Sequence, residues 1–140
     1  MICKNLGGKM EIISHIIDDT TREKAEVTFI VDKNNFISPK SKQDEDILIN
    51  FWNINDEILK EFINFINQTI NNNEEKISLL TDTKKYIFVD REEIYDLAVN
   101  NLDINATQDE IDDEIDEIVE NAIFGYESAI LIKKQDLEKR

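Results

Sequence analysis

The chain has 140 residues and a formal net charge of −15 at pH 7. This charge argues against direct binding to nucleic acid or to an anionic membrane, because like charges repel. The single cysteine, Cys3, excludes a disulfide framework, and no apolar run approaches the ~18 residues of a membrane-spanning helix. We therefore expect a protein of the cytoplasm, in a bacterial host cell.

The negative charge is concentrated in one segment of the chain. Residues 90–120 carry 13 acidic residues and one basic residue, Arg91, whereas residues 1–89 have a net charge of −4 and residues 121–140 a net charge of +1. A segment this anionic favours a basic protein as the partner.

The start of the chain predicts a β-hairpin behind a short leader. Residues 1–9 are predicted to be a non-native or flexible leader, because DNA encoding the letters GGKM resembles a ribosome-binding site just before a start codon at Met10. Residues 10–140 are then expected to form a single acidic α+β domain. The β-branched runs at 10–17 and 25–32 predict the two strands of the hairpin. Residues 33–46, which contain the only proline, Pro39, are predicted to be a connection.

The middle of the chain predicts a helix, a second hairpin and another helix. Apolar residues at three- and four-residue spacing predict a helix over 53–70, with Asn53 or Asn55 as its cap. Residues 76–82 and 84–90 predict the second hairpin, and residues 91–102 the next helix. A final strand is predicted at 128–134, at the edge of the sheet. The expected fold is α+β: two β-hairpins form an antiparallel sheet, packed by about three helices.

An acidic helix is predicted over the segment TQDEIDDEIDEIVENAIF, residues 107–124. Thr107 followed by Glu110 matches a capping box, which marks the start of the helix. One apolar stripe then predicts the inner face: Ile111, Ile115, Ile118, Val119 and Ala122.

The outer face of this helix is the predicted partner-binding site. Five pairs of residues four apart are both acidic, which costs roughly 1–2.5 kcal/mol at ~0.2–0.5 kcal/mol per pair. A helix face that only solubilises the domain remains an alternative, but such faces usually mix Glu with Lys. Carboxylates one turn apart lie ~5–6 Å apart, comparable to neighbouring phosphates on one DNA strand. The predicted partner-binding residues are Asp109, Glu110, Asp112, Asp113, Glu114, Asp116, Glu117 and Glu120.

These observations predict an acidic binding protein without enzymatic activity. The leading hypothesis is an inhibitor that acts as a DNA mimic on a basic, nucleic-acid-binding partner, as a phage anti-CRISPR or anti-restriction protein would. The first alternative is an immunity protein against a basic toxin nuclease. The second is a Ca²⁺-binding regulatory module, because Asp103, Asn105, Thr107, Asp109 and Glu114 fall at EF-hand ligand positions 1, 3, 5, 7 and 12. Gln108 stands where that loop needs glycine, and Glu110 where it needs an apolar residue.

The sequence lacks the motifs of common enzymes. Gly7, Gly8 and Gly125 are the only glycines, so no phosphate-binding or dinucleotide-binding loop is present. His15, the only histidine, lies on a predicted strand, and no nucleophile–histidine pair can be assembled around it. No cofactor is expected.

Overall fold

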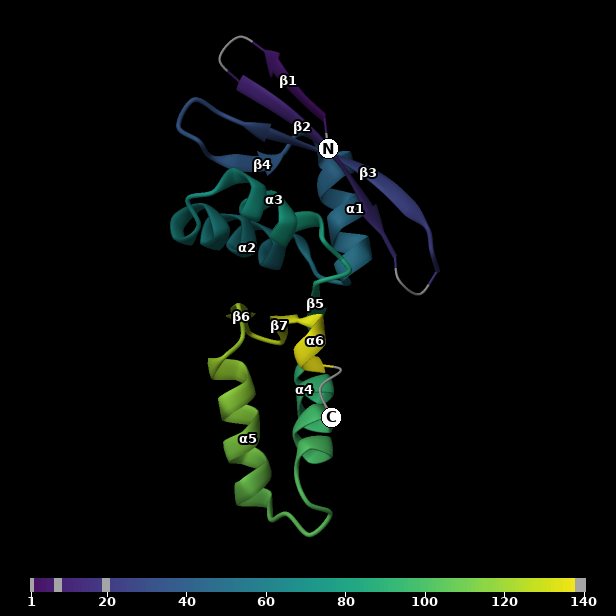
Figure 1. Ribbon diagram of the computed structural model, residues 1–140, viewed down its shortest axis with the longest axis vertical. Coiled ribbons are helices and arrows are strands. Elements are labelled where there is room, and N and C mark those ends of the chain that lie inside the picture. Colours follow the sequence, from purple (N-terminus) through teal and green to yellow (C-terminus); the bar gives the residue numbers. More distant parts are fainter. Residues whose placement is uncertain (1, 7–8, 19–20, 138–140) are drawn as a thin grey trace. The chain divides into compact units, whose positions relative to one another are not determined.

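The computed structural model describes residues 2–6, 9–18 and 21–137. The chain forms two compact units, Met1–Lys84 and Lys85–Arg140, which we call unit 1 and unit 2. Each unit combines helices with its own antiparallel sheet (Figure 1). The predicted α+β class is therefore confirmed. The prediction of one sheet built from two hairpins and packed by about three helices is wrong, since the described residues form two sheets and six helices.

Unit 1 contains a sheet in the order β1-β2-β3-β4. The predicted first hairpin is confirmed: β2 and β3 pair antiparallel, with Ser14 opposite Val27. The segment 1–9 includes β1, which pairs with β2, while residues 1, 7 and 8 lie outside the described residues. A native start at Met10 stays a prediction. The strands are β1 (Ile2–Leu6), β2 (Lys9–Ile17), β3 (Lys24–Val31) and the short β4 (Ile37–Pro39).

Alternation along β2 and β3 gives the unit 1 sheet one apolar face. Ile12, Ile16, Val27 and Phe29 are at most 3% exposed, as expected for residues two apart on a strand. The described residues of this unit form three helices, of which α2 buries the most apolar side chains, including Phe62. The helices are α1 (Lys42–Trp52), α2 (Asp56–Thr69) and α3 (Asn73–Thr81).

Helix α2 matches the predicted helix at 53–70, and its cap is Asn55, whose side chain accepts from the backbone N–H of Ile58. Residues 33–46, predicted to be a connection, instead contain β4 and the start of α1. The cap of α1 is Ser41, three residues before Asp44. This capping box uses Asp in place of the usual Glu or Gln, so the sequence signal was missed.

The predicted second hairpin is wrong. Of its first half, residues 76–82, all but the last residue lie in helix α3, whose N-cap is Asn72 and whose C-cap is Asp82. A short apolar run such as ISLL does not distinguish a strand from a buried helix. Its second half forms the predicted strand, β5 (Tyr86–Val89), but the partner of β5 is β7 (Ala129–Lys133), far along the chain.

Unit 2 consists of a three-stranded sheet and the helices α4, α5 and α6. The sheet order is β5-β7-β6, so the final strand is central, not at the edge as predicted. The burial of Ala129, Ile130, Leu131 and Ile132 fits this central position. The remaining elements are α4 (Arg91–Asn101), α5 (Gln108–Glu120), β6 (Phe124–Tyr126) and α6 (Lys134–Leu137).

Candidate partner-binding helix

Helix α5 begins at the predicted capping box. The backbone N–H of Glu110 donates to Oγ1 of Thr107 over 3.2 Å, and the N–H of Thr107 donates to Oε1 of Glu110 over 3.4 Å. These two bonds satisfy backbone donors that the first helical turn leaves without an internal acceptor. The acidic residues Asp109 and Glu110 also lie at the positive end of the helix dipole. The beginning of the acidic helix is therefore determined locally.

The inner face of α5 packs on the core of unit 2. This core contains Val89, Ile94, Ile130 and Ile132. Four residues of the predicted apolar stripe contact it, namely Ile115, Ile118, Val119 and Ala122. Ile111 is half-buried. The neighbouring helix α4 runs beside α5 in unit 2 and buries Ile94, Leu97 and Ala98 (Figure 1).

Three of the eight predicted partner-binding carboxylates have hydrogen bonds within the chain. Glu110 belongs to the capping box. Asp112 accepts from Nε2 of Gln108 over 2.9 Å, and the half-buried Glu114 accepts from Nδ2 of Asn101 over 3.4 Å. These contacts hold the three carboxylates on the surface of the helix.

The other five are exposed, and among the described residues they have no hydrogen-bond or ion-pair partner for their carboxylates. We call this set the free acidic stripe: Asp109, Asp113, Asp116, Glu117 and Glu120. At about 100° per residue, these side chains fall within about 100° of the helix circumference, opposite the apolar stripe. With a rise of 1.5 Å per residue, the stripe is about 17 Å long. Its charges therefore form one continuous line.

A cleft of about 250 Å³ adjoins the stripe within unit 2. Its lining comprises three carboxylates, two amides and three apolar side chains. Asn101, Asn121 and Asp136 are lining residues that the sequence analysis missed, because α4, α5 and α6 each contribute only part of the cleft. The lining residues are Glu114, Glu117, Asp136, Asn101, Asn121, Leu97, Ile118 and Ile132.

On helix α4, the pKa of Glu93 is raised by its surroundings. Partial burial is the main cause that raises the pKa of Glu93 above its ordinary value of 4.5, and the charges of Asp90 and Asp96 add to it. A hydrogen bond between the carboxylate of Glu93 and the backbone of Asp90 opposes this rise. Part of the negative charge of unit 2 is thus held at an energetic cost.

The Ca²⁺ candidates lie on the α4–α5 connection and the first turns of α5. In that segment the hydroxyl of Thr107 takes part in the capping box. Within residues 2–6, 9–18 and 21–137, no three His, Cys, Asp or Glu side chains lie close enough to hold a metal ion. The proposed ligands Asp103 and Asn105 are exposed. Calcium binding stays a prediction.

Comparison with protein-family models, with curated proteins and with solved structures finds no match. Among the described residues, no helix is long and apolar enough to cross a membrane.

Proposed function

We propose that this chain is a non-enzymatic inhibitor that places the free acidic stripe of α5 in the basic, nucleic-acid-binding site of a partner protein. The observation that carries this proposal is the lack of any compensating cation for Asp109, Asp113, Asp116, Glu117 and Glu120 among the described residues. Exposed like charges four residues apart destabilise a helix. A basic partner would neutralise these charges and remove their repulsion, so the relief of repulsion would contribute to the free energy of binding.

The spacing of the charges supports a nucleic-acid-binding site as the target. Five carboxylates along about 17 Å are separated by four intervals of about 4 Å on average, which is close to the spacing of about 3.4 Å between phosphates on one strand of DNA. The stripe therefore offers a basic groove a charge density similar to that of its natural ligand. Such a complex is expected to form quickly and to weaken as salt rises.

The cleft beside the stripe supplies a place for one side chain of the partner. The stem of a Lys or Arg can lie against Leu97 and Ile118 while its cationic head approaches Glu114 and Glu117. Arg suits this place because its planar head binds carboxylates in bidentate geometry. A phosphate chain offers no equivalent of this apolar contact, so the cleft would add specificity to the charge attraction.

The test compares three baits in a nuclease-treated bacterial lysate: the wild-type chain, the variant Asp113→Lys/Glu117→Lys/Glu120→Lys, and a control. The control Glu23→Lys/Glu61→Lys/Glu75→Lys makes the same change in net charge at exposed positions of unit 1. Wild type and control should capture the same basic protein, and the α5 variant should not. Duplex DNA should then displace that purified protein from the wild-type chain.

Two results contradict the proposal. One is retained capture by the α5 variant, because the stripe would then be dispensable. The other is a captured protein that binds duplex DNA and this chain at the same time, because the two would then occupy different sites. A captured toxin nuclease would identify the chain as an immunity protein that uses the same surface.

A further inference from the structure

Strand β3 has one edge that is only partly covered. Its other edge pairs with β2 over the full length of the strand, from Lys24 to Val31. On the partly covered edge, β4 pairs only with the end of β3, where Phe29 lies opposite Pro39. The first half of β3 therefore has no strand partner on this side among the described residues.

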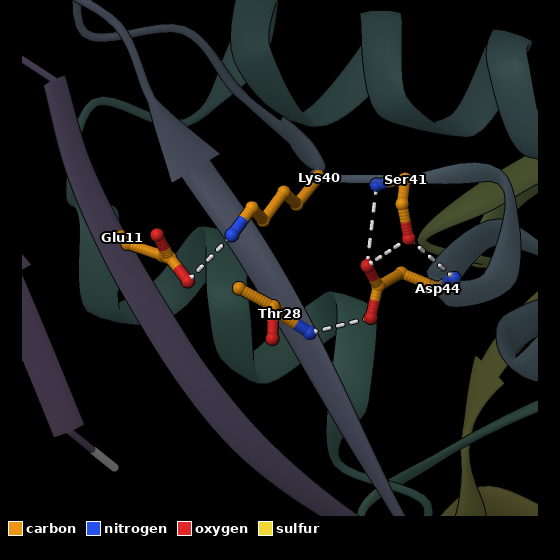
Figure 2. Close-up of polar contacts among 5 residues, drawn as sticks. All are labelled: Glu11, Thr28, Lys40, Ser41 and Asp44. Atoms are coloured by element: carbon orange, nitrogen blue, oxygen red, sulfur yellow. Dashed lines mark hydrogen bonds and ion pairs between the residues drawn. The ribbon is translucent and has the colours of Figure 1, made fainter.

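Where β4 ends, the carboxylate of Asp44 takes the place of the next hydrogen-bond acceptor on the edge of β3. The backbone N–H of Lys40 donates to the carbonyl of Thr28 over 2.9 Å, as a further residue of β4 would. The N–H of Thr28 instead donates to Oδ1 of Asp44 over 2.9 Å, while Oδ2 accepts from Oγ of Ser41 over 2.6 Å (Figure 2). Both backbone groups of Thr28 are thus satisfied within the chain.

Beyond Thr28, the edge is open. Backbone groups of alternate residues face the same edge of an antiparallel strand, so the N–H and C=O groups of Glu26 and Lys24 face the same side as those of Thr28. A groove of about 510 Å³ adjoins this edge, and it is lined by Ala25 and Glu26 of β3 and by Gln43 and Ile47 of α1. An unpaired edge of this kind is a template for another strand.

We propose that the open edge of β3 binds the same edge of a second copy of this chain, in antiparallel orientation. The charges of Lys24 and Glu26 complement those of a second copy in one register only, and this favours a second copy of the chain as the occupant. With Ala25 opposite Ala25 of the second copy, Lys24 lies opposite Glu26 of the second copy at both hydrogen-bonded pairs. The neighbouring registers place Lys24 opposite Lys24, or Glu26 opposite Glu26, which is unfavourable.

The length of the pairing is limited at both ends by Thr28. Its N–H and C=O already have partners in Asp44 and Lys40, so the added strand cannot extend past Val27. A two-fold pairing of one edge with itself is closed, which yields a dimer and not a fibre. The small side chain of Ala25 at the two-fold axis leaves room for the close approach of the two strands. This interface lies in unit 1 and is separate from the α5 stripe of the proposed function.

The test is sedimentation of the full chain over a concentration series in ~0.15 M NaCl, where charges more than ~8 Å apart are largely screened. Wild type should show reversible dimers. Glu26→Lys and Lys24→Glu each place like charges opposite each other twice, and should weaken the dimer about tenfold or more. The double exchange Lys24→Glu/Glu26→Lys should restore it, and Glu61→Lys, an exposed change of equal charge, should leave it unchanged.

A second variant tests the backbone pairing itself. Glu26→Pro removes an N–H that faces the open edge and leaves the bonds between β3 and β2 intact, so it should yield a folded monomer by circular dichroism. A wild-type chain that stays monomeric throughout the series overturns the proposal. So does a double exchange that fails to restore the dimer, or a dimer that persists in Glu26→Pro.

Discussion

The two units use their acidic residues differently. Unit 1 has 84 residues with a net charge of −5, and unit 2 has 56 residues with a net charge of −10. In unit 1, Lys40 contacts Glu11 and Lys42 contacts Asp56, each at 3.0 Å, and Asp44 accepts bonds from two segments of the chain. In unit 2, the carboxylates of the free acidic stripe have no Lys, Arg or His partner among the described residues. The number of acids is thus less informative than the number of acids that folding leaves without a partner.

The largest expected change in stability comes from a substitution that tests whether unit 2 has a core of its own. Ile130→Ala removes a buried core side chain from the central strand β7, and should lower the free energy of unfolding by about 2–5 kcal/mol. Amides of β5 and β6 should lose protection in hydrogen exchange. Ile104→Ala, at a side chain that is 96% exposed, should change the stability little. A loss below about 1 kcal/mol for Ile130→Ala would contradict a core of this kind in unit 2.

The second prediction compares the loss of stability when a buried acidic residue of unit 1 and an exposed acidic residue of unit 2 are each replaced. Asp44→Ala removes the capping box of α1 and leaves the N–H of Thr28 without an acceptor, and should cost about 2–3 kcal/mol in urea unfolding. Asp44→Asn keeps one acceptor oxygen and should cost less. Asp113→Ala should be neutral or slightly stabilising. Equal costs for Asp44→Ala and Asp113→Ala would remove the distinction between the two units.

The third effect tests the repulsion on α5 directly. Raising NaCl from low to moderate concentration should raise the melting temperature of the isolated chain, because salt screens exposed like charges. The variant Asp113→Asn/Asp116→Asn/Glu120→Gln should melt higher at low salt and respond less to salt. A wild-type melting temperature that is flat or falls over this range would mean that these carboxylates are already compensated.

The smallest effect concerns Glu93. Because its pKa is raised in the folded chain, Glu93 costs stability at neutral pH, and the cost disappears as pH falls through that raised pKa. Glu93→Gln should therefore raise the melting temperature slightly at pH 7, and this advantage should vanish once pH is below the ordinary value of 4.5. Glu92→Gln, an exposed neighbour, serves as the control. An advantage of Glu93→Gln that persists at low pH would contradict a charge effect.

The sequence by itself determined the elements whose signals are local. The hairpin of β2 and β3, the helices α2, α4 and α5, and the cap at Thr107 follow from side-chain period and from capping chemistry within a few residues. The eight acidic residues of α5 were equally visible. Which of the eight carboxylates have a hydrogen-bond partner could not be fully predicted from the sequence, because Glu114 accepts its bond from Asn101, which lies on another helix.

Only the tertiary structure decided the features that join distant segments. Strand β7 is central because it pairs with both β5 and β6. Residues 76–81 form a helix, although a short apolar run is compatible with either a strand or a helix. The bond from Thr28 to Asp44 ended one ladder and left the first half of β3 open. Local sequence sets propensity, but which buried surfaces and backbone groups meet depends on the whole chain, and that decides which charges and edges remain without partners.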